Sequence, residues 1–165
     1  MRKIGIFSIA VLISVFIFIA GYSEESDRNV KTIQTYLENE FTGPNDELIN
    51  ALEQESAYPP ELQSYLEENY KPLVTDLDRL IRSNLVLIWL REATANGYQL
   101  KPLQIEIQKA ESQNKAYDFE VKVEYSKDDQ TNTEIITGRI NIDDNGKIVS
   151  IRNMNGFELI EHMKK

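Results

Sequence analysis

Few side chains in this chain are of the types that carry out chemistry. The sequence has 165 residues and no cysteine, which excludes disulfides, thiolate metal sites and a cysteine nucleophile. Its one histidine, His162, lies close to the C-terminus without a partner pattern around it, so we expect it to be exposed and not catalytic. No serine lies in a Gly-x-Ser-x-Gly elbow, and no glycine-rich loop would cradle a phosphate. We therefore predict no catalytic set, no metal site and no cofactor.

Carboxylates remain as candidates for acid–base chemistry. A buried Asp, Glu or Tyr acts as a general acid or base when an apolar pocket raises its pKa. We single out Glu92 and Glu106, because either one in a pocket would favour an enzyme and both on the outside would exclude one. The stretch Asp143-Asp144-Asn145-Gly146 lacks the spaced oxygens and the distal Glu of a calcium loop, and it predicts a hairpin turn instead.

Aromatic side chains are the other candidates for contact with a ligand. We select Trp89, Tyr98 and Tyr117 as candidate ligand-binding residues. For Trp89, and for the alternating row that begins at Tyr117, the simpler interpretation is packing in the core. No run of basic residues accompanies these rings, so stacking on nucleic acid is not expected.

The charge of the chain indicates which partners it attracts. The formal net charge is −9, and without Arg2 and Lys3 the part from Glu24 onward carries 16 positive against 27 negative side chains, or −11. Such a surface repels nucleic acid and anionic polymers and steers cationic molecules toward it. We expect a cationic or envelope protein partner and no nucleic acid.

The N-terminal 23 residues predict the location of the protein. Arg2 and Lys3 precede an apolar run from Ile4 to Gly21, which is how a signal peptide or a signal anchor is built. An apolar run of this length lies at the lower limit for a membrane-spanning helix, which is roughly 20 residues. The positive charges before the run place the N-terminus inside and the rest of the chain outside.

The end of the apolar run carries a resemblance. Ile19-Ala20-Gly21-Tyr22-Ser23 resembles the lipobox of Gram-positive bacterial lipoproteins, in which Gly precedes a lipid-bearing cysteine. Tyr22 stands where that cysteine belongs, so lipid attachment does not carry over to this chain. Two outcomes remain: cleavage after Ser23, which gives a secreted protein, or an uncleaved membrane anchor through Ile4–Gly21.

Residues 27–96 predict helices. Apolar residues recur there at spacings of three and four, which is the helical period. We expect one helix from about Ser26 to Phe41, two short helices near 45–52 and 62–70, and the longest helix from Asp76 to about Ala95. Asn96-Gly97 would end that last helix.

Residues 100–153 predict a sheet, because apolar and polar residues alternate there with a period of two. The expected strands are residues 100–110, 116–125, 133–142 and 147–153, with a polar loop at 126–132 and a short helix at 157–163. Pro102 predicts an edge strand or a bulge, and Gly138 predicts a bulge or a bend.

These elements predict an α+β fold, with N-terminal helices packed on one face of a four-stranded, curved antiparallel sheet. Residues 24–165 would form a single domain behind the leader. The order and spacing of the elements resemble the nuclear-transport-factor-2-like (cystatin-like) fold, which occurs in small exported bacterial proteins. The resemblance implies a bent sheet that wraps the helices into a cone, whose mouth holds a ligand or is filled by side chains.

The preferred interpretation is a non-enzymatic extracytoplasmic binding or accessory domain of the bacterial envelope. Two alternatives stay open. One is an isomerase, dehydratase or hydrolase of the cone-shaped fold. The other is an anchored subunit of a secretion or conjugation complex, which predicts an uncleaved leader and an exposed apolar patch of several hundred Å² in order of magnitude.

Overall fold

The computed structural model describes residues 24–54, 56, 58–111 and 115–165. The apolar run Ile4–Gly21 and the lipobox-like segment lie outside these residues, so the expectation of an anchor helix is not addressed by the fold. Within the described ranges, no helix combines the length and the apolar character needed to cross a bilayer.

The order of the elements confirms an α+β architecture in which the helices precede the strands. The helices are α1 (Glu24–Phe41), α2 (Asp46–Leu52), α3 (Pro60–Asn69), α4 (Leu77–Arg82), α5 (Ile88–Asn96) and, after the sheet, α6 (Glu158–Met163). The strands are β1 (Gln99–Lys109), β2 (Ala116–Lys127), β3 (Gln130–Ile142) and β4 (Ile148–Asn155).

The four strands form one antiparallel sheet in the order β1-β2-β3-β4. Both expected irregularities are present: the register shifts between Pro102 and Gln104 in the edge strand β1, and again opposite Gly138 in β3. Gly138 is needed because a Cβ there would lie 2.6 Å from Cζ of Phe119. The expected loop at 126–132 is wrong, since β2 and β3 continue to Lys127 and Gln130 as exposed, polar strand ends.

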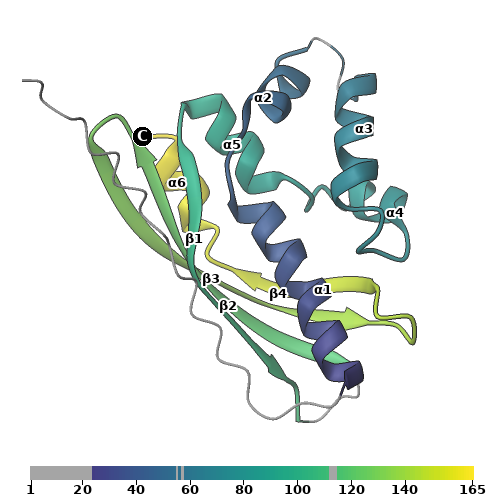
Figure 1. Cartoon of the computed structure of the whole chain (residues 1–165). Helices are drawn as coiled ribbons and strands as arrows, with labels where there is room; N and C mark the ends of the chain where they lie inside the picture. The colour runs from purple at the N-terminus through teal and green to yellow at the C-terminus, as the bar shows by residue number, and fades with distance from the viewer. Residues whose placement is uncertain (1–23, 55, 57, 112–114) are drawn as a thin grey trace, which may run out of the picture.

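The helices pack on one face of the sheet, and Figure 1 shows the strands bending around them. Helices α1 and α5 contact β1 and each other, whereas α2 contacts α3 and α5, and α6 contacts α5. The inner face of β2 supplies the alternating row that the sequence predicts. Its buried members are Tyr117, Phe119, Val121, Val123 and Tyr125.

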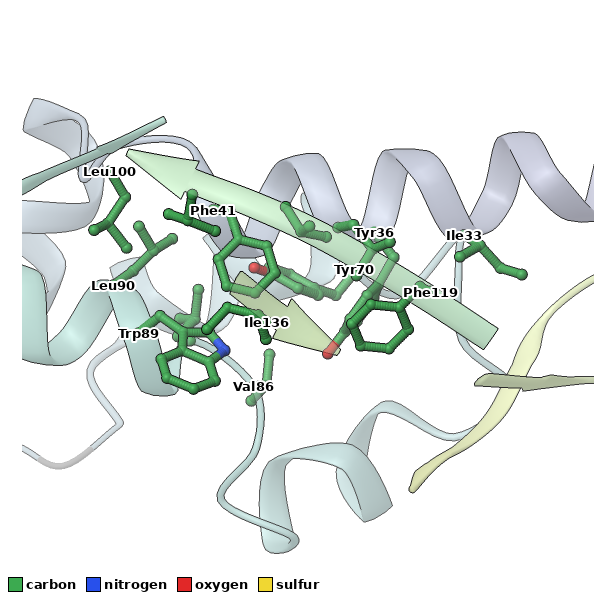
Figure 2. Close-up of a cluster of buried hydrophobic side chains, with 14 of the residues drawn as sticks. Ile33, Tyr36, Phe41, Tyr70, Val86, Trp89, Leu90, Leu100, Phe119 and Ile136 are labelled. Carbon is green, nitrogen blue, oxygen red and sulfur yellow. The ribbon is translucent and has the colours of Figure 1, made fainter. Parts of the chain in front are cut away.

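Between this face and the helices lies the core. Figure 2 shows Phe41, Trp89 and Leu90 at one end of the cluster, and Tyr36 and Tyr70 further along it. The rings of Phe41 and Trp89 are 5.8 Å apart, and the rings of Tyr36 and Tyr70 meet edge to face at 5.7 Å. The interior beneath α1 and α5 is therefore filled by side chains.

One expected element is wrong: the long helix from Asp76 to about Ala95 is two helices, α4 and α5. Asp76 caps α4 by accepting the Arg79 N–H at 2.8 Å, and the helix ends at Arg82. Residues 83–87 then leave the helical path, with φ of +56° at Asn84 and +60° at Leu87. The reason is a tertiary contact, because the Leu87 N–H donates to the side chain of Glu40 on α1.

Candidate functional site

The three candidate ligand-binding residues do not share one site. Trp89 is fully buried and stacks on Phe157 at a ring distance of 5.4 Å. Tyr117 is 2% exposed, and its hydroxyl accepts the side-chain N–H of Asn29 at 3.2 Å. Tyr98 is half-buried beside Tyr125. Tyr125 lies at the opposite end of β2 from Tyr117, roughly 26 Å along the strand. Of the three, Tyr98 alone lies at the surface.

Tyr98 belongs to a cluster with Tyr125, Glu134 and His162, which we call the His162 cluster. The Nδ1 atom of His162 lies 3.3 Å from both the Tyr125 hydroxyl and a Glu134 carboxylate oxygen. The His162 ring stacks on Tyr125 at 6.2 Å, and Tyr98 lies 6.0 Å from Tyr125. The partners of His162 come from β2 and β3, which are distant from it in the sequence.

The His162 cluster has simple acid–base capacity. A carboxylate at Nδ1 favours the tautomer that carries its proton there, which leaves Nε2 with a free lone pair. The side chain is 40% exposed, so solvent reaches part of the imidazole ring. No group of three or more metal-ligating side chains occurs in the described part of the chain. A lone imidazole with one carboxylate neighbour is a proton acceptor rather than a metal centre.

A second polar centre lies inside the core, around Glu40. This side chain is 3% exposed, and each of its two oxygens accepts the Leu87 N–H at 3.2 Å. The Tyr70 hydroxyl donates to the Asn39 carbonyl oxygen at 3.1 Å, and the hydroxyls of Tyr70 and Tyr36 lie near enough to the Glu40 carboxyl to act on its pKa. Burial raises the pKa of the Glu40 carboxyl to about 7, although the Leu87 N–H and the two hydroxyls act to lower it. Burial likewise raises the pKa of Tyr36 and Tyr70 well above the usual value.

The sequence held a signal for Glu40 that the selection of Glu92 and Glu106 missed. Glu40 follows Ile33 by seven positions and Tyr36 by four, so it lies on the apolar stripe of α1. An acid on the buried side of an amphipathic helix is rare and needs a partner. Glu92 is a half-buried residue on α5 that accepts the side-chain N–H of Asn96 at 2.9 Å.

Glu106 lies on the outer face of the sheet, in an open groove of about 340 Å³ that we call the outer-face groove. Strands β1, β2, β3 and β4 all contribute to its lining. The lining residues are Glu106, Gln108, Asp118, Phe119, Glu120, Thr137, Gly138, Arg139 and Asn153. Glu106 thus faces a polar, solvent-filled hollow and not the enclosed apolar pocket that acid–base catalysis favours.

The charges of the outer-face groove are only partly compensated. Arg139 binds Asp118 in a two-pronged ion pair, with N–O distances of 2.6 and 2.8 Å, and this contact lowers the pKa of Asp118. Glu106 and Glu120 stand directly opposite each other in the register of β1 and β2. Glu106 accepts the side-chain N–H of Gln104 at 2.7 Å. Among the described residues, neither of these two carboxylates forms an ion pair.

With this geometry established, the chain can be compared with known proteins. Comparison with protein-family models, with curated proteins and with solved structures gives no match. The candidate sites are therefore judged on their own chemistry. The outer-face groove offers two facing carboxylates without an ion pair among the described residues, the His162 cluster offers a partly exposed imidazole, and the Glu40 centre is enclosed.

Proposed function

We propose that residues 24–165 are a non-catalytic binding domain of an exported envelope protein, and that the outer-face groove binds the cationic groups of its partner. The leader-like run Ile4–Gly21 supports a place outside the membrane. The resemblance to small exported proteins of the nuclear-transport-factor-2-like fold supports the same role.

The observation that carries this proposal is the facing pair Glu106 and Glu120. Like charges placed directly opposite on neighbouring antiparallel strands repel each other and destabilise the pair. A guanidinium or ammonium group seated between them would remove that repulsion and form charge-assisted hydrogen bonds. The groove is open and wide enough to admit a lysine or arginine side chain of a partner.

The whole-domain charge acts in the same direction. From Glu24 onward there are 16 positive and 27 negative side chains, so cations are attracted before contact is made. This long-range attraction is sequence-independent and is screened by salt, with a Debye length of about 8 Å at physiological ionic strength. Any difference in affinity between groove and control variants that persists at physiological ionic strength therefore has to come from contacts in the groove.

The test is the binding of a fluorescent oligo-arginine peptide by the full-length protein, measured by fluorescence anisotropy at physiological salt. The variant with both Glu106→Gln and Glu120→Gln is compared with a control that carries Glu61→Gln and Glu68→Gln on the exposed side of α3. Both variants lose two negative charges. We expect the groove variant to bind about tenfold more weakly than the control, which corresponds to about 1.4 kcal/mol.

Equal losses in the two variants would show that net charge alone attracts the peptide, and the groove would then have no role. Failure of the parent protein to bind any cationic peptide would remove the proposal.

The Glu40 centre favours an enzyme as a second candidate function. A carboxyl group with a pKa of about 7 in an apolar setting has the property that a general acid or base requires. Nuclear magnetic resonance titration with small carbonyl compounds and esters tests this candidate. Binding should perturb the signals of Tyr36 and Tyr70, and an interior that stays silent to the whole panel would exclude it.

A further inference from the structure

The segment 83–87 interrupts a stretch whose sequence is suited to one continuous helix. Apolar residues keep the helical spacing on both sides of the break, from Leu77 through Leu85 to Trp89. No glycine or proline occurs between Leu77 and Asn96. Ser83 and Asn84 help to end α4 locally, since the Ser83 hydroxyl accepts the Leu85 N–H and Asn84 tolerates its φ of +56°. Nothing local favours the left-handed conformation of Leu87, and a contact from elsewhere in the fold holds it.

That contact is the carboxyl group of Glu40. In a continuous helix the Leu87 N–H would donate to the carbonyl oxygen of Ser83. Here it donates to the two Glu40 oxygens, each at 3.2 Å. To form this bond, Leu87 adopts a φ of +60°, a backbone conformation that residues other than Gly, Asn and Asp rarely adopt. Glu40 thus stabilises a backbone conformation that the local sequence disfavours.

Glu40 is also the group in this region that changes charge near neutral pH. The titratable side chains that bear on it are Tyr36 on α1 and Tyr65 and Tyr70 at α3, and the pKa of each is raised above its ordinary value of 10. They remain neutral while Glu40 ionises. The segment itself, Ser83-Asn84-Leu85-Val86-Leu87, contains no ionisable side chain.

We propose that residues 83–87 are a pH-controlled gate, closed over a neutral Glu40 and opening as this carboxyl group ionises. The Leu87 N–H favours the ionised carboxylate, but the loss of hydration on burial is the larger effect, so the ionised form favours a conformation that admits water. Opening supplies that water, and it also releases Leu87 from its left-handed conformation. The closed gate is consequently favoured at acidic pH and weakened as the pH rises.

Opening would uncover an apolar interior. Val86 and Leu87 are 4% and 0% exposed and belong to the core cluster that includes Trp89. Val86 and Trp89 are drawn at the same end of the cluster in Figure 2. Leu85 of the same segment lines a small cavity of about 130 Å³ with Leu80 and Ile148. This inference does not depend on the outer-face groove, which lies on the other face of the sheet.

The absence of cysteine allows a direct test with single thiols in the full-length protein. Val86→Cys places a thiol in the gate, and Val121→Cys places one in β2, where the native side chain is equally buried. Each is made with and without Glu40→Gln. Labelling rates at about pH 6 and pH 8.5 are divided by the rate of the same variant unfolded in denaturant, which removes the pH dependence of the thiol itself.

We expect the normalised rate at Val86→Cys to rise about tenfold between these pH values, because ionisation of Glu40 shifts the opening equilibrium by that factor. In the presence of Glu40→Gln it should not change. The normalised rate at Val121→Cys should not change with pH, either with or without Glu40→Gln. A flat rate at the gate, the same rise with Glu40→Gln, or an equal rise in β2 would each overturn the proposal.

A second measurement needs no thiol. Hydrogen exchange of the Leu87 amide in the parent protein, followed by nuclear magnetic resonance and corrected for intrinsic exchange, should lose about tenfold in protection over the same range. The amide of Val121 should keep its protection. Constant protection at Leu87 would contradict the gate even if Val86→Cys failed to fold.

Discussion

At the scale of single residues, the side chain with the largest consequences is Glu40. Its carboxyl group accepts the Leu87 N–H, which in a continuous helix would donate to a backbone carbonyl oxygen. Two tyrosine hydroxyls lie close to it in a region that is otherwise apolar. Buried carboxyl groups are tolerated when hydrogen bonds satisfy them, and they remain sensitive to their own ionisation. The position of Glu40 on the apolar stripe of α1 therefore sets how the stability of the domain depends on pH.

The free energy of unfolding should fall as the pH rises. Burial raises the pKa of Glu40 from 4.5 to about 7 in the folded state. A raised pKa means that the folded state holds the proton more tightly. The stabilisation is complete below pH 4.5, the unfolded value, and is lost as the pH rises through about 7. The free energy of unfolding of the parent protein, measured with urea, should be about 3 kcal/mol lower at pH 8 than at pH 5.

Glu40→Gln is the matched comparison for this prediction, since it keeps the shape and the acceptor oxygen and has no charge to titrate. The other titratable groups are present in both proteins. The difference between parent and variant should therefore carry the whole effect. Parallel pH profiles for the two proteins would contradict the prediction.

In the outer-face groove, Arg139 is predicted to oppose the binding of cations. Its guanidinium holds Asp118 with N–O distances of 2.6 and 2.8 Å and contributes the positive charge among the groove's lining residues. Arg139→Gln would leave Asp118 unpaired and add its charge to those of Glu106 and Glu120. Exposed ion pairs are worth less than about 1 kcal/mol, so we expect about threefold tighter binding of the oligo-arginine peptide.

The control for that measurement is Arg82→Gln on α4, which makes the same change in net charge on an exposed residue away from the groove. It should leave the anisotropy curve within the scatter of the parent. Weaker binding by Arg139→Gln would mean that Arg139 itself contacts the peptide.

At the scale of elements, the strands could be predicted and the break between α4 and α5 could not. The alternation of apolar and polar residues from Tyr117 to Tyr125 predicts which face of β2 is buried, and the structure confirms that face. The bulges at Pro102 and opposite Gly138 follow from the chemistry of single residues. Leu87 in the break contacts Glu40, which is 47 positions away in the sequence. The spacing of apolar residues around Leu87 gives no information about such a distant contact.

The same distinction applies to the candidate sites. His162 meets Tyr125 and Glu134 only because α6 folds back against the sheet, so its partners were not readable from the tail sequence. The polar lining of the outer-face groove was implicit in the outward alternation of Glu106 and Gln108. What alternation does not give is the register, which places Glu106 opposite Glu120.

The turn between β3 and β4 carries a prediction about an element as a whole. Asp143 accepts the backbone N–H groups of Asn145 and Lys147 at 2.8 and 2.9 Å, and it accepts the Thr75 hydroxyl at 3.0 Å. These bonds, the one from Lys147 first, lower the pKa of Asp143. Asp143→Ala should cost about 1–2 kcal/mol in urea unfolding at neutral pH.

Because the pKa of Asp143 is lowered by folding, its stabilisation is present at neutral pH and is lost as the pH falls through the folded value. The gap between parent and Asp143→Ala should shrink in acid, at pH values below the ordinary aspartate pKa of 3.8. Asp144→Ala serves as the control, since the Asp144 side chain is 91% exposed and should cost less than about 1 kcal/mol. A gap for Asp143→Ala that does not change with pH would argue against the ionised turn.

At the scale of the whole molecule, the proposed role depends on which side of a membrane the acidic domain occupies. Arg2 and Lys3 precede the apolar run Ile4–Gly21, and acidic residues follow it, so the positive-inside bias predicts that residues 24–165 lie outside the membrane. On the proposed topology, an acidic domain held close to a membrane would be repelled by anionic lipid.

We therefore expect that protease added to intact protoplasts of a Gram-positive host producing the full-length protein digests residues 24–165, or that the domain is already in the medium. A cytosolic protein produced in the same cells should stay intact, which shows that the protoplasts are sealed. Mass spectrometry of the recovered protein then separates the two forms, since a start at Glu24 means cleavage and a retained leader means an anchor. Full protection until lysis would place the domain in the cytosol, where an envelope partner could not reach the groove.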